Sequence, residues 1–269
     1  MIKHEYNLQT FYNEDEISYY LLGAFMADGC VHIVKNRNKK QVSLTSKDDD
    51  WLIAMNQFIS PNKKLEKKSE TCNMIQYNST ALGDWFISKG CVPRKSKIMD
   101  FPNIPVEYLP DFIRGCWDGD GTVSFNKNSN GGKNFQAGIF LTSGSLLFCN
   151  KMVIALELLG ISSKVITHNT PERTIDGRTL KPSYNWRVRV SKIENCYNFC
   201  KLIYYNDNLL CLNRKKEVAN NIIYYVENNN CIDCSINLGK IRSKTVRCKE
   251  CKRLFYNANK RIIYSEKIK

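Results

Sequence analysis

The chain has 269 residues, 43% of them hydrophobic, and its 40 Lys and Arg against 26 Asp and Glu give a formal net charge of +14; this size allows two modest cores and an appendage. No apolar run approaches the roughly 20 residues that span a bilayer, which argues against a membrane protein or a membrane partner. The N-terminal segment is acidic (Glu5, Glu14, Asp15, Glu16) and lacks an apolar signal core, so we expect an intracellular protein that works in the compartment where it is synthesised, the cytoplasm of a bacterium or phage-infected cell or an organelle interior.

A nine-residue phrase occurs twice, as LLGAFMADG at 21–29 and IRGCWDGDG at 113–121. Each copy is typical of the end of a short helix, because acidic residues or a proline occupy the expected first turn. Gly29 and Gly121 are predicted to provide a left-handed cap. Asp28 and Asp120 then lie at helix C-termini, where the helix dipole disfavours a carboxylate.

A divalent cation would compensate this unfavourable charge, because it binds carboxylate and backbone carbonyl oxygens together, here the carbonyls of Ala27 and Gly119. Gly23 and Gly115 lie inside the same helices, at a cost of about 1 kcal/mol each relative to alanine. A position without a side chain lets two helices pack closely, so we expect the helices to bring Asp28 and Asp120 together on a pseudo-twofold axis. For either copy alone, a solvated helix end is an equally good interpretation; the shared register of two copies disfavours it.

The repetition continues beyond the two phrases, because each half reads helix, two strands, helix, two strands, helix. The predicted strand pairs are 31–34 with 41–45, 63–68 with 74–79, 122–126 with 135–142, and 164–167 with 184–190. A basic segment ends each half, at 94–97 and at 214–217. Longer loops near 128–134 and 169–182 are predicted to account for the greater length of the second half.

Basic and amide side chains follow the predicted solvent-facing sides and hairpin loops of these strands. Any one of them is best explained as part of a solvated strand face, but together with the net charge they indicate a polyanionic partner. They are Lys35, Arg37, Lys39, Lys40, Gln41, Lys63, Lys64, Lys67, Lys68, Lys127, Lys133, Gln136, Lys164, Arg187 and Arg189.

The twelve cysteines fall into two groups. Eight are scattered among predicted core positions and are interpreted as reduced, structural thiols. The other four, Cys231, Cys234, Cys248 and Cys251, form two Cys-x2-Cys pairs. This spacing is typical of a tetrahedral, structural Zn2+ site; redox pairs or free thiols are the alternatives.

The segment from Asn229 onward is also strongly basic, with eleven Lys or Arg against three Asp or Glu. Arg242, Lys244 and Arg247 suit contact with DNA phosphates. The alternative is a zinc module that only packs on the main body.

The two phrases resemble the motif of the LAGLIDADG homing endonucleases, in their single-chain, two-repeat form. The similarity runs from about residue 17 to 220 and includes both basic segments and the segment 101–112, which leads into the second phrase. The zinc segment lies outside it. Met26 departs from the namesake phrase, which has an acid there; we do not expect catalysis to depend on this position.

The resemblance implies an α+β fold of two pseudo-twofold-related αββαββα units, 1–103 and 104–228, with antiparallel saddle-shaped sheets over double-stranded DNA, plus a zinc-ribbon-like module at 229–269. It also implies a monomeric endonuclease that makes double-strand breaks, with Asp28 and Asp120 each holding Mg2+ near one scissile phosphate. The basic residues near the family's active sites carry over to Lys95 and Lys215, with Lys97 as the alternative to Lys95.

Other functions remain open on this scaffold: an RNA-binding intron maturase, or a catalytically inactive DNA-binding regulator. An intact aspartate in each copy favours the nuclease. The three histidines, His4, His32 and His168, are dispersed, so a His-metal nuclease centre is not expected. An intein is not expected either, because the sequence starts with Met1 and ends Ile268-Lys269 rather than with His-Asn.

Overall fold

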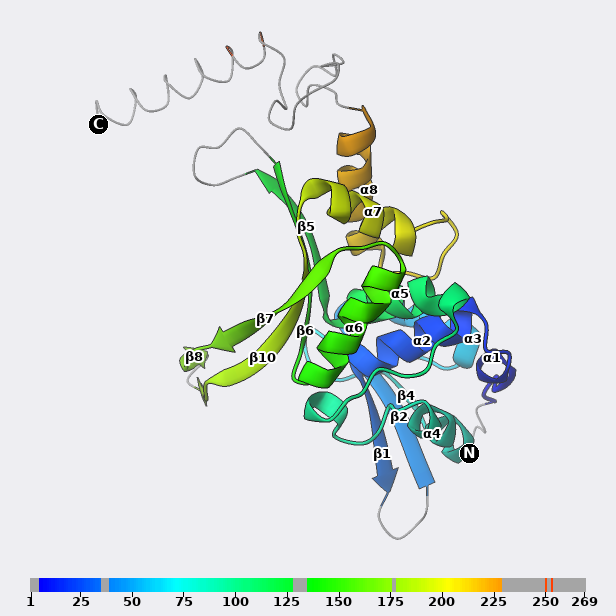
Figure 1. The fold of residues 1–269 in the computed structure, drawn as a ribbon. Helices are drawn as coiled ribbons and strands as arrows, with labels where there is room; N and C mark the ends of the chain where they lie inside the picture. The colour runs from blue at the N-terminus through cyan, green and yellow to red at the C-terminus, as the bar shows by residue number, and fades with distance from the viewer. Residues whose placement is uncertain are drawn as a thin grey trace, which may run out of the picture.

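The computed structural model describes residues 5–34, 39–127, 135–175, 178–228, 250 and 253. Two helices that carry the repeated phrase lie side by side at its centre (Figure 1). α2 (Glu16–Ala27) begins after Asp15, whose side chain accepts a hydrogen bond from the Ser18 amide at 3.0 Å. α5 (Leu109–Asp120) has Pro110 in its first turn. Proline is tolerated there because a backbone amide in the first turn has no acceptor within the helix.

The two helices touch backbone to backbone. A Cβ atom on Gly23 would lie 2.2 Å from the Phe112 carbonyl oxygen, and one on Gly115 would lie 2.1 Å from that of Tyr20. Any side chain at these positions would overlap the partner helix. The predicted close packing through the two glycines is confirmed.

The first half supplies one four-stranded antiparallel sheet, in the order β1-β2-β4-β3. Val42, Leu44, Ile75 and Tyr77 are buried on its inner face, against which α3 and α4 pack. The elements are α1 (Gln9–Tyr12), β1 (Gly29–Val34), β2 (Lys39–Ser46), α3 (Asp49–Ile59), β3 (Glu66–Lys67), β4 (Asn73–Tyr77), α4 (Thr80–Ser88) and the 3-10 turn η1 (Lys95–Lys97).

The second half supplies the matching sheet, in the order β5-β6-β10-β7. Ile139, Leu141, Val188 and Val190 are buried on its inner face, which α6 and α7 cover. The elements are η2 (Val106–Tyr108), β5 (Gly121–Lys127), β6 (Phe135–Ser143), α6 (Leu146–Leu158), β7 (Ser163–Thr170), β8 (Arg173–Ile175), β9 (Arg178–Leu180), β10 (Ser183–Val190), α7 (Ile193–Ile203) and α8 (Asn213–Asn228). The two sheets with their helices confirm the α+β class and the two-repeat arrangement.

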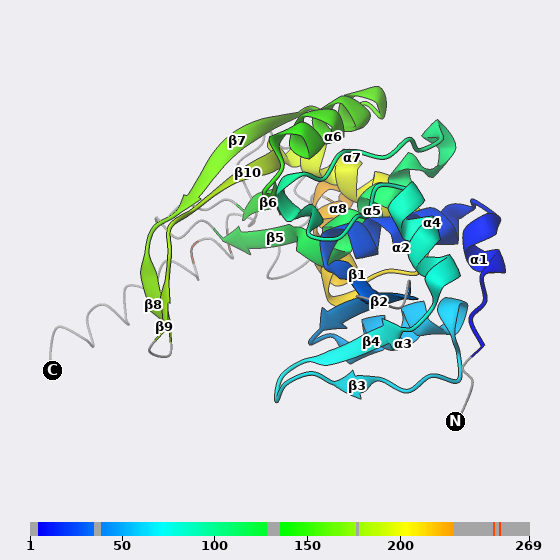
Figure 2. The same cartoon turned by 90° about the horizontal axis from the view of Figure 1, so that it is seen from below.

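Both sheets extend to the same side of the central helix pair (Figure 2), and α3, α4, α6 and α7 pack against their inner faces. None of the helices in the described part of the chain is both long and apolar enough to cross a membrane. The face of each sheet opposite the packed helices carries exposed polar side chains, among them Lys39, Gln136 and Arg189.

The predicted left-handed caps at Gly29 and Gly121 are wrong. Gly121 has an extended backbone, with φ −83° and ψ 163°, and both glycines are the first residues of strands. Glycine is needed there for space: a Cβ would lie 2.6 Å from the Phe25 carbonyl oxygen at Gly29 and 2.5 Å from the Trp117 carbonyl oxygen at Gly121. The chain turns directly from helix into strand and folds back on the last helical turn.

Several other predicted elements differ from the structure. The loop predicted at 169–182 contains the hairpin β8–β9, and the basic segment at 214–217 is the first part of α8. The strand predicted at 63–68 is reduced to two residues. Six of the eight scattered cysteines are buried and all eight are free thiols, but Cys30 is exposed, because it faces away from the core in β1, and Cys72 is half-buried.

Candidate active site

Asp28 and Asp120 lie side by side where the two central helices end. Asp28 caps α2 and Asp120 is the last residue of α5, and the charge of Asp120 acts directly on the Asp28 carboxyl group. The space around the pair is tight: a Cβ on Gly119 would lie 3.3 Å from Asp28 Oδ2. Two adjacent carboxylates repel each other unless a proton or a cation lies between them.

The environment of this pair opposes a double negative charge. The pKa of Asp28 is raised to about 6, first by desolvation and then by the charge of Asp120, and desolvation likewise raises the pKa of Asp120. Both residues are nevertheless exposed to solvent on one side, so a ligand can reach them. In the described part of the chain, neither carboxyl group lies within ion-pair distance of a Lys or Arg, and no cluster of three or more acidic, His or Cys side chains forms a metal site.

A buried lysine stands next to each aspartate. Lys95 Nζ donates to the carbonyl oxygen of Gly29, and Lys215 Nζ donates to that of Gly121 at 2.7 Å. The two glycines occupy equivalent places in the repeats, so the two lysines do as well. Lys97, the alternative to Lys95, is exposed.

Lys215 makes further hydrogen bonds to the last turn of α5. Its Nζ also lies within hydrogen-bond distance of the carbonyl oxygens of Trp117 (2.7 Å), Asp118 (2.7 Å) and Gly119 (3.0 Å), so three N–H donors are shared among four carbonyls. A cation at a helix C-terminus satisfies carbonyls that have no intrahelical partner. Desolvation is the largest cause that lowers the pKa of Lys215 to about 8. The Gly119 carbonyl, a candidate metal ligand, has the longest of the four distances to Lys215 Nζ and keeps at least one lone pair for a metal ion.

A buried network that the sequence did not reveal positions Lys215. Asp118 accepts hydrogen bonds from the hydroxyls of Tyr20 (2.9 Å) and Tyr204 (2.8 Å) and from the Leu212 amide (2.8 Å), and Trp51 Nε1 donates to the Tyr20 hydroxyl at 2.6 Å. Leu212 in turn accepts the Lys215 amide. This carboxyl group therefore ties the start of α8 to both repeats. Its partners lie up to 98 residues away in the chain, and no sequence pattern relates them.

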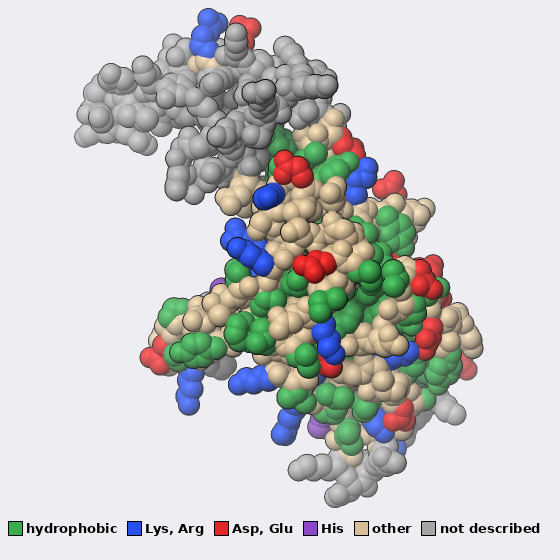
Figure 3. Space-filling model, viewed as in Figure 1, with side chains coloured by type: hydrophobic (Ala, Val, Ile, Leu, Met, Phe, Trp, Pro, Cys, Tyr) green, Lys and Arg blue, Asp and Glu red, His purple; other side chains and the backbone are tan. Residues whose placement is uncertain are grey.

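Some of the predicted DNA-contacting residues are engaged with other side chains, and others are exposed on the sheets. Lys40 forms an ion pair with Asp84 at 2.8 Å, and Gln41 donates to Asn78 at 2.8 Å. Lys39, Gln136 and Arg189 are exposed on the outer faces of the sheets, and Arg187 is half-buried there. Figure 3 shows Lys and Arg side chains projecting between the hairpin end of the second sheet and the first sheet.

Several predicted residues fall outside the described part of the chain. They are Lys35, Arg37, Lys133, the four cysteines Cys231, Cys234, Cys248 and Cys251, and the basic residues Arg242, Lys244 and Arg247; for Lys127 only the backbone is described. The structure therefore tests neither the Zn2+ site nor the DNA contacts predicted for these residues.

Residues 107–204, most of the second half, match the family of the LAGLIDADG-like domain. A DNA polymerase of Thermococcus sp. (strain GE8) is 30% identical over 101 residues, a match that covers 38% of this chain and only 5% of the polymerase. The chain thus spans about one twentieth of that relative's length.

Solved structures share the fold at low sequence identity. The LAGLIDADG homing endonuclease I-GzeII, in complex with its DNA target, has a TM-score of 0.53 at 11% identity and covers 78% of this chain and 90% of its own. The LAGLIDADG meganuclease I-AabMI, bound to uncleaved DNA, has a TM-score of 0.50 at 12% identity and covers 78% and 91%. Residues 107–204 thus form a LAGLIDADG-like domain, within a chain that has the fold of LAGLIDADG endonucleases of known structure.

Proposed function

We propose that this protein is a site-specific DNA endonuclease that hydrolyses one phosphodiester bond in each strand of a long duplex target. The observation that carries the proposal is the paired Asp28 and Asp120, each at the end of a central helix and each accompanied by a buried lysine. The matched fold, bound to DNA in I-GzeII and I-AabMI, supports the substrate class. The two sheets offer their outer faces to the duplex on the side where the aspartates are exposed.

The residues fit a divalent cation, in our proposal Mg2+. Two adjacent carboxyl groups with raised pKa values are a poor arrangement without a cation, and Mg2+ is commonly held by one or two carboxylates together with substrate phosphates. When bound, Mg2+ supplies a nucleophilic water and neutralises the phosphate and the leaving oxygen. Asp28 and Asp120 would hold the ions, and the Ala27 and Gly119 carbonyls are proposed as further ligands.

Lys95 and Lys215 are proposed to stabilise the negative charge that develops on the phosphate. Their ammonium groups are already fixed by backbone carbonyls, so no reorientation is needed when the duplex binds, which is the condition for effective electrostatic catalysis. The asymmetry in their hydrogen bonds predicts that Lys215 is the more rigidly held of the two.

We further propose that the protein acts as a monomer of three parts, the repeats 1–103 and 104–228 and a basic Zn2+ module at 229–269. One chain already contains both aspartates, so no second copy is needed to cut both strands. The proposed Zn2+ module would add phosphate contacts beside those of the sheets.

Binding of Mg2+ to the aspartate pair is expected to weaken as the pH falls below about 6, the raised pKa of Asp28. Because the metal binds deprotonated carboxylates, affinity should drop about tenfold per pH unit for each proton displaced. The same raised pKa means that protonated Asp28 favours the fold below its ordinary pKa, and that this contribution is lost as the pH rises through about 6. Mg2+ should therefore raise the Tm at about pH 7.5 and scarcely at about pH 5.

Calorimetric titration and thermal unfolding at both pH values measure these effects. Asp28→Asn is the control, because a variant without the titrating carboxyl group should lose most of the pH dependence. An Mg2+ effect of the same size at both pH values would contradict the assignment of this pair as the metal site.

The proposed activity is tested by incubating the full chain with Mg2+ and a library of long duplexes, and then sequencing the ends. We expect double-strand breaks at one recurrent sequence, and none when EDTA replaces Mg2+. Duplex bound specifically but never cut would indicate an inactive regulator. RNA bound with no duplex cut would indicate a maturase, and either result would overturn the proposal.

A further inference from the structure

Arg187 lies near the middle of the outer face of the second sheet. It belongs to β10, an inner strand, where it pairs with Thr142 of β6 and Ile166 of β7. Its neighbours Val188 and Val190 are buried and face the core. Because side chains alternate along a strand, Arg187 and Arg189 both face outward.

The Arg187 side chain is held in one orientation. Its Nε donates to Thr142 Oγ1 at 3.2 Å, and its guanidinium carbon lies 4.3 Å from the centre of the Phe140 ring. Arg189 contrasts with it, being exposed and having no hydrogen-bond or ion-pair partner among the described residues. The aromatic stacking and the hydrogen bond together restrict the side chain before it binds, so less conformational entropy is lost on binding.

Within the part of the chain that the structure describes, the two terminal nitrogens of Arg187 are free to donate hydrogen bonds, and their geometry suits guanine. With Nε engaged, the two terminal nitrogens keep their donors, and no acidic group among the described residues forms an ion pair with them. The pKa of Arg187 is lowered by desolvation and by Arg189, so a nearby acceptor would relieve an unfavourable environment. Two parallel donors are complementary to the O6 and N7 acceptors of guanine in the major groove.

The first repeat has no such group at the equivalent place. Thr45 corresponds to Thr142, and its partner in β4 is Met74, as Arg187 is the partner of Thr142 in β10. Met74 has no donor. The two sheets therefore differ at a position that the internal symmetry makes directly comparable.

We propose that Arg187 is a specificity-determining residue that reads a guanine in the half of the target bound by the second repeat, with no counterpart in the other half. This inference rests on the proposed DNA-binding function. Arg187 and its supports on β6, Thr142 and Phe140, form the reading unit.

The test measures binding, without Mg2+, to duplexes that carry the target selected by the full chain, with each base pair varied in turn. Wild type should prefer G at one position of one half-site by roughly 5- to 100-fold, the range for a good bidentate contact. Arg187→Lys keeps the charge but not the planar pair of donors, so it should abolish this preference while the preferences at other positions stay within about twofold.

Two matched variants separate this role from general charge or folding effects. Arg189→Lys should leave the G preference intact, and Thr142→Val, which removes only the orienting acceptor, should reduce it by about threefold or more. A G preference unchanged in Arg187→Lys, or lost equally in Arg189→Lys, would overturn the assignment. If the full chain selects no duplex at all, the proposed function fails and this inference fails with it; if duplex is selected without a position sensitive to Arg187, only this inference fails.

Discussion

Asp28→Asn and Asp120→Asn, made singly, are each expected to reduce double-strand cleavage by about 10^3-fold or more while leaving DNA affinity nearly unchanged. Asparagine keeps the size of the side chain but removes the charge that would hold a metal ion. The two residues lie together at the ends of α2 and α5, so losing either one impairs the shared centre. Each single variant is expected to retain slow nicking of one strand.

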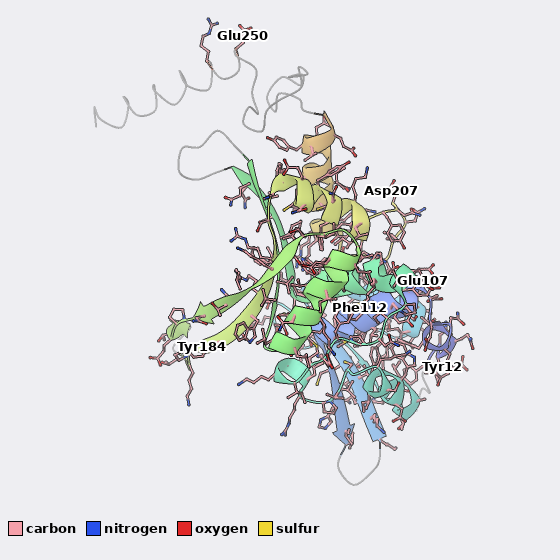
Figure 4. All side chains as sticks on the ribbon, in the orientation of Figure 1. Tyr12, Glu107, Phe112, Tyr184, Asp207 and Glu250 are labelled. Atoms are coloured by element: carbon pink, nitrogen blue, oxygen red, sulfur yellow. The ribbon has the colours of Figure 1, made fainter. Side chains whose placement is uncertain are left out.

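Duplexes labelled separately on each strand measure the two cuts independently, and a gel-shift assay without Mg2+ measures affinity. Glu107→Gln is the matched control, because it removes an exposed acid from η2, on the helical side of the molecule away from the sheets (Figure 4). The control should cut both strands at the wild-type rate. Full double-strand cleavage by Asp28→Asn would show that Asp28 is not part of the catalytic centre.

Gly115→Ala is expected to destabilise the protein by about 3 kcal/mol or more, although it adds a single methyl group. That methyl would lie 2.1 Å from the Tyr20 carbonyl oxygen and 2.8 Å from the Ala24 amide nitrogen, both backbone atoms of the facing helix. Backbone cannot rotate away as a side chain can, so α2 and α5 must separate. For a chain of this size the loss corresponds to a fall in Tm of roughly 6–12 °C.

Thermal unfolding measures this loss, and Gly138→Ala provides the control. A methyl at Gly138 would meet only side-chain atoms, Ser124 Oγ at 2.7 Å and a Phe140 ring carbon at 3.6 Å, so the stability change should stay within about 1 kcal/mol. Because separated helices also part the two aspartates, Gly115→Ala protein that remains folded should lose cleavage of both strands. An unaltered Tm would refute backbone contact between the central helices.

Local sequence patterns predicted most secondary-structure elements correctly where the two repeats show the same pattern. The phrase helices, most strand pairs and the glycines of the helix contact follow from residues close together in the chain, because periodicity and helix-end chemistry are local properties. Gly29 and Gly121 depart from the predicted caps, since a glycine after a helix is as compatible with a sharp turn into a strand as with a left-handed cap. Local patterns also missed the β8–β9 hairpin in a polar segment with no apolar alternation.

The residues alone reveal the duplication, the pair of acids and the reason why glycine stands between the helices. The folded chain alone shows that desolvation raises the pKa values of both carboxyl groups, that Lys215 closes the end of α5, that buried Asp118 holds the start of α8, and that Arg187 has an orientation which Arg189 lacks. The physical reason is distance along the chain: these contacts join residues 45 to 98 positions apart, so they depend on how the two repeats pack, and packing is a property of the assembled core rather than of any segment.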